Sequence, residues 1–206
     1  MNKEQDSTRD EYPVVKEGAV VEIKVKGSRF IARVLPVADR QNAEKRYEEI
    51  RKQFYKATHN CMAYRIDQNI FRYSDDGEPS GTAGQPILQA IDGTGVLETL
   101  CVVTRYFGGT KLGTGGLIRA YGEAARLALE RSVIVKKTRR KQMRIQFKYE
   151  LESPIRRLIE CFHARLDESV YGEEITMDVS VPESLHERFV AALTETTNSQ
   201  AKLIFK

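Results

Sequence analysis

The chain has 206 residues, of which 41% are hydrophobic and 30% are charged, and its formal net charge is +4. This composition is typical of a soluble globular protein with one large or two small domains. Residues 1–10 are strongly polar, which excludes the apolar core of a signal peptide, and no stretch approaches membrane-spanning length. The three widely spaced cysteines are an odd number and indicate reduced thiols. We therefore expect a cytoplasmic protein with no membrane partner.

The first part of the chain, residues 1–135, alternates between strand and helix patterns. It opens with a hairpin, because Val21, Ile23 and Val25 alternate with charged residues before a glycine turn. Asp39 is placed to cap the helix that follows, whose apolar residues form one stripe. The other expected elements are strands at 29–37, 59–66, 70–74 and 96–105 and helices at 84–92 and 114–131. This order predicts an α+β domain with helices packed on a sheet.

The last part of the chain, residues 143–206, has a second and separate pattern. Met143, Ile145 and Phe147 alternate with polar residues, as expected for a half-buried strand. The remaining elements are helices at 154–162 and 183–197 and strands at 165–171, 174–181 and 201–205. The order βαββαβ predicts a ferredoxin-like domain, so the fold class is α+β in two domains.

The joint between the two patterns is strongly basic. Residues 131–144 contain seven Lys or Arg and no acidic residue, and we interpret 136–142 as a linker. Arg139, Arg140 and Lys141 are candidate contacts for an RNA backbone or another acidic surface. A solvated basic linker without a partner has the same composition.

A glycine-rich turn joins the strand at 96–105 to the helix at 114–131. Glycines without side chains expose backbone N–H groups, and a helix N-terminus adds partial positive charge. Arg105, Lys111 and Arg119 surround this turn, so it is a candidate anion or RNA site, although the spacing fits neither a Walker loop nor a dinucleotide fingerprint. Alternatively, the glycines only allow the helix to pack tightly on its strand. The glycines are Gly108, Gly109, Gly113, Gly115 and Gly116.

An acidic loop at 74–88 is a possible second site. Asp75, Asp76 and Glu78 are carboxylates of the kind that hold Mg²⁺, and His59 with Cys61 has the spacing of a base and a nucleophile on one strand face. Both sets also have ordinary structural explanations, as turn residues and as strand filler. We assign no catalytic residue, no metal ligand and no cofactor.

Three strings of the sequence resemble the IMPACT family. They are ATHNCMAY at 57–64, DDGEPSGTAG at 75–84 and RYFGGTKLGTGGLIRAY at 105–121. The resemblance implies a first domain similar to the second domain of a small-subunit ribosomal protein, and a second domain similar to a C-terminal domain of elongation factor G. It also implies a link to translation, since eukaryotic relatives act on the starvation control of initiation by binding a regulator of its kinase.

Together these features predict a translation-associated binding or regulatory protein that contacts RNA, the ribosome or a ribosome-associated protein. The alternative is an enzyme that acts on a phosphate-containing small molecule, with Mg²⁺ at the acidic loop. The sequence does not determine the oligomeric state.

Overall fold

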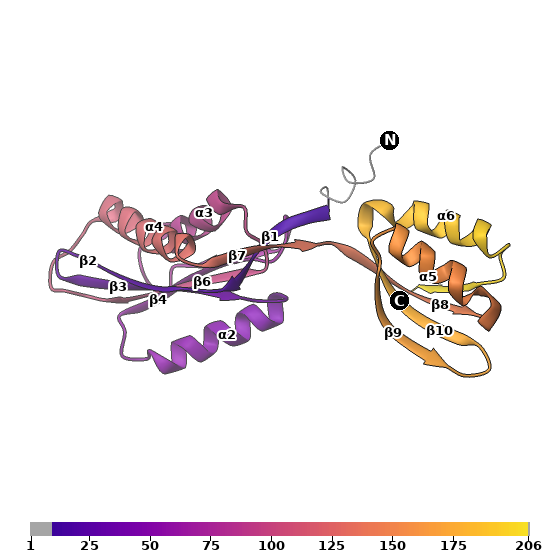
Figure 1. Cartoon of the computed structure of the whole chain (residues 1–206). Coiled ribbons are helices and arrows are strands. Elements are labelled where there is room, and N and C mark those ends of the chain that lie inside the picture. The colour runs from indigo at the N-terminus through magenta and orange to yellow at the C-terminus, as the bar shows by residue number, and fades with distance from the viewer. Residues whose placement is uncertain (1–9, 206) are drawn as a thin grey trace. The chain divides into compact units, whose positions relative to one another are not determined.

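The computed structural model describes residues 10–205, which form two compact units (Figure 1). We call Pro13–Lys136 the N-terminal unit, and residues 10–12 with the described residues from Lys137 onward the C-terminal unit. Among the described residues, no helix combines the length and the apolar character needed to cross a membrane.

The N-terminal unit is built on a five-stranded antiparallel sheet in the order β2-β3-β6-β4-β5. Two helices, α3 and α4, cover one face of this sheet, and α2 covers the other (Figure 1). Because both faces are covered, the central strand β6 is buried along nearly its whole length. The elements are β2 (Val20–Val25), β3 (Ser28–Pro36), α2 (Arg40–Gln53), β4 (His59–Arg65), β5 (Phe71–Ser74), α3 (Gly84–Thr94), β6 (Thr99–Tyr106) and α4 (Thr114–Glu130).

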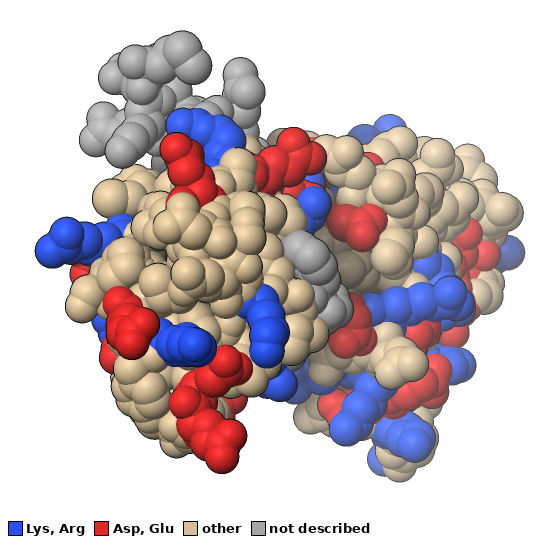
Figure 2. All heavy atoms as spheres, turned by 90° about the vertical axis from the view of Figure 1, so that its right-hand side faces the viewer, with Lys and Arg blue, Asp and Glu red and all other residues tan. Residues whose placement is uncertain are grey.

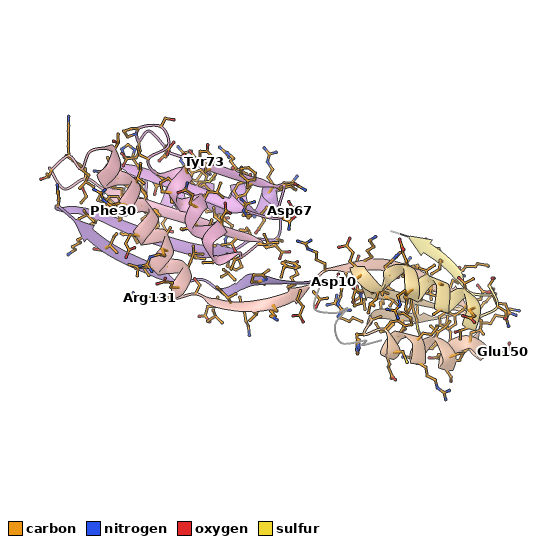
Figure 3. All side chains as sticks on the ribbon, turned by 90° about the horizontal axis from the view of Figure 1, so that it is seen from above. Asp10, Phe30, Asp67, Tyr73, Arg131 and Glu150 are labelled. Carbon is orange, nitrogen blue, oxygen red and sulfur yellow. The ribbon has the colours of Figure 1, made fainter. Side chains whose placement is uncertain are left out.

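Local sequence features account for these elements as expected. Lys26 and Gly27 both have positive φ, 44° and 83°, which is the geometry of a type I′ hairpin turn between β2 and β3. The Asp39 carboxylate accepts a hydrogen bond from the amide of Asn42 at 2.8 Å and so caps α2. On the sheet face that α3 and α4 cover, Phe30 of β3 packs edge-on against Tyr121 of α4, with 5.1 Å between the ring centroids. Phe30 is labelled in Figure 3.

The C-terminal unit has the predicted βαββαβ order. Its four-stranded antiparallel sheet runs β11-β8-β10-β9, and two helices cover one face (Figure 1). The apolar residues that alternate along β8 point to that covered face and are buried. The elements are β8 (Arg140–Phe147), α5 (Glu152–Cys161), β9 (Arg165–Tyr171), β10 (Ile175–Pro182), α6 (His186–Thr196) and β11 (Lys202–Phe205). The prediction of a two-domain α+β protein is confirmed.

The structure corrects the interpretation of the basic joint. Where the linker 136–142 is predicted, the chain forms strand β7 (Val133–Thr138), which pairs with β1 (Glu11–Glu17), and β8 then begins at Arg140. Arg139 alone separates β7 from β8. A strand exposed along its length tolerates the lysines and arginines that made this segment resemble a linker.

We predict that Gly108→Ala destabilises the protein, whereas Gly93→Ala stabilises it. A Cβ at Gly108 would lie 1.9 Å from the carbonyl carbon of Gly27, but one at Gly93, within α3, meets no atom within 4 Å. Overpacking should lower the free energy of unfolding by about 1–3 kcal/mol, and removal of a helical glycine should raise it by about 0.5–1 kcal/mol. Urea unfolding followed by circular dichroism measures both. Equal stability of the two variants would contradict the close approach of the glycine-rich turn at Gly108 to the hairpin turn at Gly27.

Candidate functional site

A hollow of about 420 Å³ lies in the N-terminal unit at the start of α4. Residues from four segments line it: the start of β4, the acidic loop, the end of β6 and the glycine-rich turn. We call it the α4 hollow. The side chains that matter below are Thr58, His59, Glu78, Arg105, Lys111 and Thr114. The structure thus brings the acidic loop and the glycine turn together, a relation that sequence reasoning left open.

A buried ion pair forms the floor of this hollow. Arg105 Nη1 donates to Glu78 Oε1 at 2.6 Å, and the two side chains are only 6% and 3% exposed. The guanidinium also lies 5.5 Å from the ring centroids of both Phe30 and Phe107. Its Nε is buried and has no hydrogen-bond partner among the described residues. Because a buried donor without an acceptor is costly, this atom marks a place where a ligand could complete the site.

Glu78 also receives a hydrogen bond from helix α4. The Tyr121 hydroxyl donates to Glu78 Oε1 at 2.7 Å. Burial raises the pKa of Tyr121 far above its ordinary value, with Cys61 and Glu78 adding to the rise, so the hydroxyl keeps its proton. Burial also raises the pKa of the Cys61 thiol, which donates to the Asp75 carbonyl at 3.0 Å. A buried thiol with a raised pKa does not behave as a nucleophile, so the geometry does not support the hypothesis of a His59–Cys61 pair.

The orientation of His59 follows from one hydrogen bond. Its Nδ1 lies 2.7 Å from the carbonyl oxygen of Asp76, and a carbonyl only accepts, so Nδ1 carries the proton. The other ring nitrogen, Nε2, lies 3.9 Å from Glu78 Oε1. In the neutral ring Nε2 is therefore an acceptor beside the Glu78 carboxylate.

The carboxylates of the acidic loop are already engaged. Asp75 accepts from the amides of Gly81, Ala83 and Gly84 at 2.8–2.9 Å, and so holds the start of α3. Asp76 accepts from the amide of Asn60 at 2.6 Å. Within residues 10–205 no group of three or more His, Cys, Asp or Glu side chains is placed to hold a metal ion. These donors do not fit the Mg²⁺ site that the enzyme alternative requires.

The glycines of the turn have distinct roles. Gly108 approaches Gly27 closely and donates its N–H to Ser28 Oγ at 3.2 Å, so tight packing explains this position. Gly109 and Gly113 have positive φ, 87° and 71°, which a residue with a side chain rarely adopts. Gly115 and Gly116 lie in the first turn of α4.

The N-terminus of α4 is bare. Its N-cap, Gly113, makes no side-chain hydrogen bond, and the first turn contains no acidic residue. The first intrahelical hydrogen bond runs from the amide of Leu117 to the carbonyl of Gly113, so the amides before Leu117 have no acceptor within the helix. Arg119, predicted to belong to this site, lines a neighbouring groove with Ile23 and Gly116, and its Nη1 would lie 3.6 Å from a Cβ at Gly115 in the first turn of α4.

A second hollow, of about 530 Å³, lies in the C-terminal unit, and we call it the arginine hollow. Arg139 and Arg140 line it, as the prediction of a basic cluster suggests, together with Arg165 of β9. Lys141 is not among its lining residues, because successive residues of β8 point to opposite faces. Arg165 was missed because only the register of β9 against β10 brings it here.

Like charges accumulate in the arginine hollow. Burial lowers the pKa of the Arg140 guanidinium, and the nearby charge of Arg165 lowers it further. Arg140 Nη1 donates to the carbonyls of His163 and Ser180 at 2.8 and 3.1 Å, which fixes its position. Figure 2 shows basic and acidic side chains interspersed over the face in view, and the residues that line the arginine hollow include four cations and one carboxylate, Glu183.

We predict that the Arg105–Glu78 pair is essential to the fold of the N-terminal unit. Arg105→Met leaves a buried carboxylate without its cation and should lower the free energy of unfolding by about 3–5 kcal/mol, and adding Glu78→Gln should restore part of this loss. The control is the exposed pair of Arg126 and Glu123, which are 2.8 Å apart on α4. Arg126→Met should lower the free energy of unfolding by no more than about 1 kcal/mol. Chemical unfolding of the parent protein and the three variants measures these effects. An Arg105→Met effect as small as that of Arg126→Met would be inconsistent with a buried pair.

Comparisons with known proteins follow the division into two units. Residues 26–129 match the Impact N-terminal domain, and residues 145–200 match a domain of unknown function (DUF1949). The chain is 38% identical to the IMPACT family member YvyE of Bacillus subtilis over 194 residues, which cover 93% of this chain and 89% of that protein. It is 33% identical to the IMPACT family member YigZ of Escherichia coli over 185 residues, which cover 88% and 91% of the two chains.

More distant relatives and a solved structure extend this picture. Protein IMPACT of Mus musculus is 34% identical over 122 residues, which cover 55% of this chain and 36% of that protein. A crystal structure described as that of a hypothetical protein, 30% identical, superposes with a TM-score of 0.70 over 96% of this chain and 98% of that one. Because both parts of the chain match over most of their length, this protein belongs to the IMPACT family.

Proposed function

We propose that this protein is a cytoplasmic, translation-associated regulatory protein that contacts RNA, either on the ribosome or in a ribosome-associated complex. The observation that carries the proposal is the arginine hollow, where Arg139, Arg140 and Arg165 come together. Arginine presents several N–H donors in a planar fork that suits phosphate oxygens, and it stays charged at any physiological pH.

The position of Arg140 beside Arg165 favours an anionic partner. The charge of Arg165 lowers the pKa of Arg140, which means that the two cations repel each other, and Asp167, which pairs with Arg165, and Asp10 offset part of this effect. A phosphate between them would relieve this repulsion, and Arg140 needs no rearrangement because two backbone carbonyls hold it in place. The open face of the sheet carries charged pairs such as Arg144 with Asp178 rather than stacked aromatic residues. RNA contact through phosphates therefore fits this unit better than base stacking on the sheet.

Two further features support the same proposal. The α4 hollow offers a second site for an anion in the N-terminal unit, at Arg105, Lys111 and Gly113. The family resemblance described above supports the connection with translation. Lys141 and Arg119, which lie outside the two hollows, contribute only to the general positive field of the protein.

Two experiments test this function. Co-sedimentation of the tagged protein with ribosomes, followed by identification of the bound RNA and protein, tests the link to translation. Filter binding of a short single-stranded RNA with a 5′-hydroxyl end, across a series of salt concentrations, tests the contact itself.

We predict that the double variant Arg139→Gln with Arg165→Gln binds this RNA more weakly. The slope of log affinity against log salt concentration should flatten by about one to two units. Each phosphate contact that is lost on a single strand reduces the magnitude of this slope by about 0.7. The control is Lys45→Gln with Arg46→Gln, which removes the same charge from exposed positions on α2. An equal effect of both double variants, or no RNA binding by the parent protein at low salt, would make protein recognition the better account.

A further inference from the structure

We propose that the α4 hollow binds the terminal phosphate monoester of a ribonucleotide, on a free mononucleotide or at an RNA end, with Glu78 accepting a hydrogen bond from a ribose hydroxyl. This inference rests on the proposed function for the nucleotide nature of the ligand. It goes further by assigning a terminal phosphate, a hydroxyl partner and a site separate from the arginine hollow.

One side of the α4 hollow consists of hydrogen-bond donors. The bare N-terminus of α4 presents amides without intrahelical acceptors, and the exposed Lys111 lies on the same wall. The floor adds Arg105, 94% buried as a side chain, whose Nε–H has no partner among the described residues. The positive end of a helix and an ammonium group suit a phosphate, and the fully buried Nε–H of Arg105 would gain an acceptor if the phosphate reached the floor.

The other side of the hollow consists of acceptors. Both hydrogen bonds to Glu78, from Arg105 and Tyr121, end on Oε1. Oε2 receives none in the described part of the chain and is not among the fully buried polar atoms that lack a partner, so it keeps a small exposed area on a side chain that is 3% exposed and lines the hollow. The Nε2 of His59, an acceptor in the neutral ring, lies next to this carboxylate. Adjacent acceptors call for a hydroxyl donor.

A ribose phosphate satisfies both sides at once. Because Glu78 neutralises Arg105, the charge left for the ligand comes from Lys111 and the start of the helix. A terminal monoester, with nearly two negative charges at neutral pH, gains more from these groups than an internal diester with one. In addition, the groups on the floor are buried, so a chain end reaches them more easily than a continuous backbone does. The volume of about 420 Å³ is within the range of pockets that hold small ligands.

The test compares two short RNAs of one sequence, labelled at the 3′ end, that carry either a 5′-phosphate or a 5′-hydroxyl. Fluorescence polarisation with the full chain should show at least about tenfold tighter binding of the phosphorylated RNA, because a charge-assisted contact is worth that much. AMP should compete with this RNA. Adenosine should not compete, and 2′,3′-dideoxy-AMP should compete several-fold more weakly because it lacks both hydroxyls.

Variants at Thr114, the first residue of α4, separate binding from folding. Thr114→Asp places a carboxylate where the phosphate is expected, yet it favours the helix dipole, so it should abolish the preference for the phosphorylated end in a folded protein. Thr114→Asn has nearly the same shape without the charge and should retain the preference. Arg126→Gln, further along α4 and outside the hollow, should also retain it.

The outcomes distinguish this inference from the proposed function. Equal binding of the two RNAs by the parent, or a preference that survives Thr114→Asp, overturns the inference and leaves RNA contact through Arg139 and Arg165 intact. Tighter binding of a phosphoserine peptide than of the phosphorylated RNA also overturns it. Binding of AMP without any binding of RNA supports the site and overturns the proposed RNA function.

Discussion

The carboxylate of Glu78 is the interaction on which the N-terminal unit depends. A charged group that is 97% buried must be compensated, and here β6 supplies the Arg105 guanidinium while α4 supplies the Tyr121 hydroxyl. One side chain from a long loop thereby fixes the central strand and the principal helix to each other. The same loop is closed from behind by Asp75, which accepts three backbone amides at the start of α3. The acidic loop is therefore a framework for the α4 hollow.

This framework separates the charges that stabilise the fold from those left for a ligand. Arg105 looks like an anion-binding residue in the sequence, but most of its charge is balanced by Glu78, and only its Nε–H lacks a partner in the described chain. Lys111 is exposed and no ion pair within residues 10–205 includes it, so it keeps its charge for solvent or ligand. Two positively charged residues of one motif, Arg105 and Lys111, thus have different physical roles. Only their burial and their hydrogen-bond or ion-pair partners distinguish them.

Much of the fold could be predicted because its signals are local. The alternation at Val21, Ile23 and Val25 and the Asp39 cap specify a hairpin and a helix within a few residues. The pairing of β1 with β7 was missed because it joins segments more than a hundred residues apart, each with a short apolar run. Arg119 lies four residues after Gly115, on the same side of α4, and its guanidinium lies close to that glycine although its side chain lines a neighbouring groove.

The two hollows differ in what they can recognise. In the arginine hollow the cations are partly exposed, as with Arg165 at 67% of its side chain, and they surround an open volume of about 530 Å³. The affinity of such a site for RNA rises with the number of phosphates in reach and falls strongly with salt concentration. Phosphate contacts of this kind do not distinguish one RNA sequence or RNA end from another. The α4 hollow opposes donors with acceptors across a smaller volume, over a floor that is almost fully buried. Selectivity requires that a wrong ligand leave buried polar groups unpaired, and the α4 hollow has such a group in the Nε of Arg105. The two proposals thus assign affinity for an RNA chain and choice of its terminus to different units of one protein.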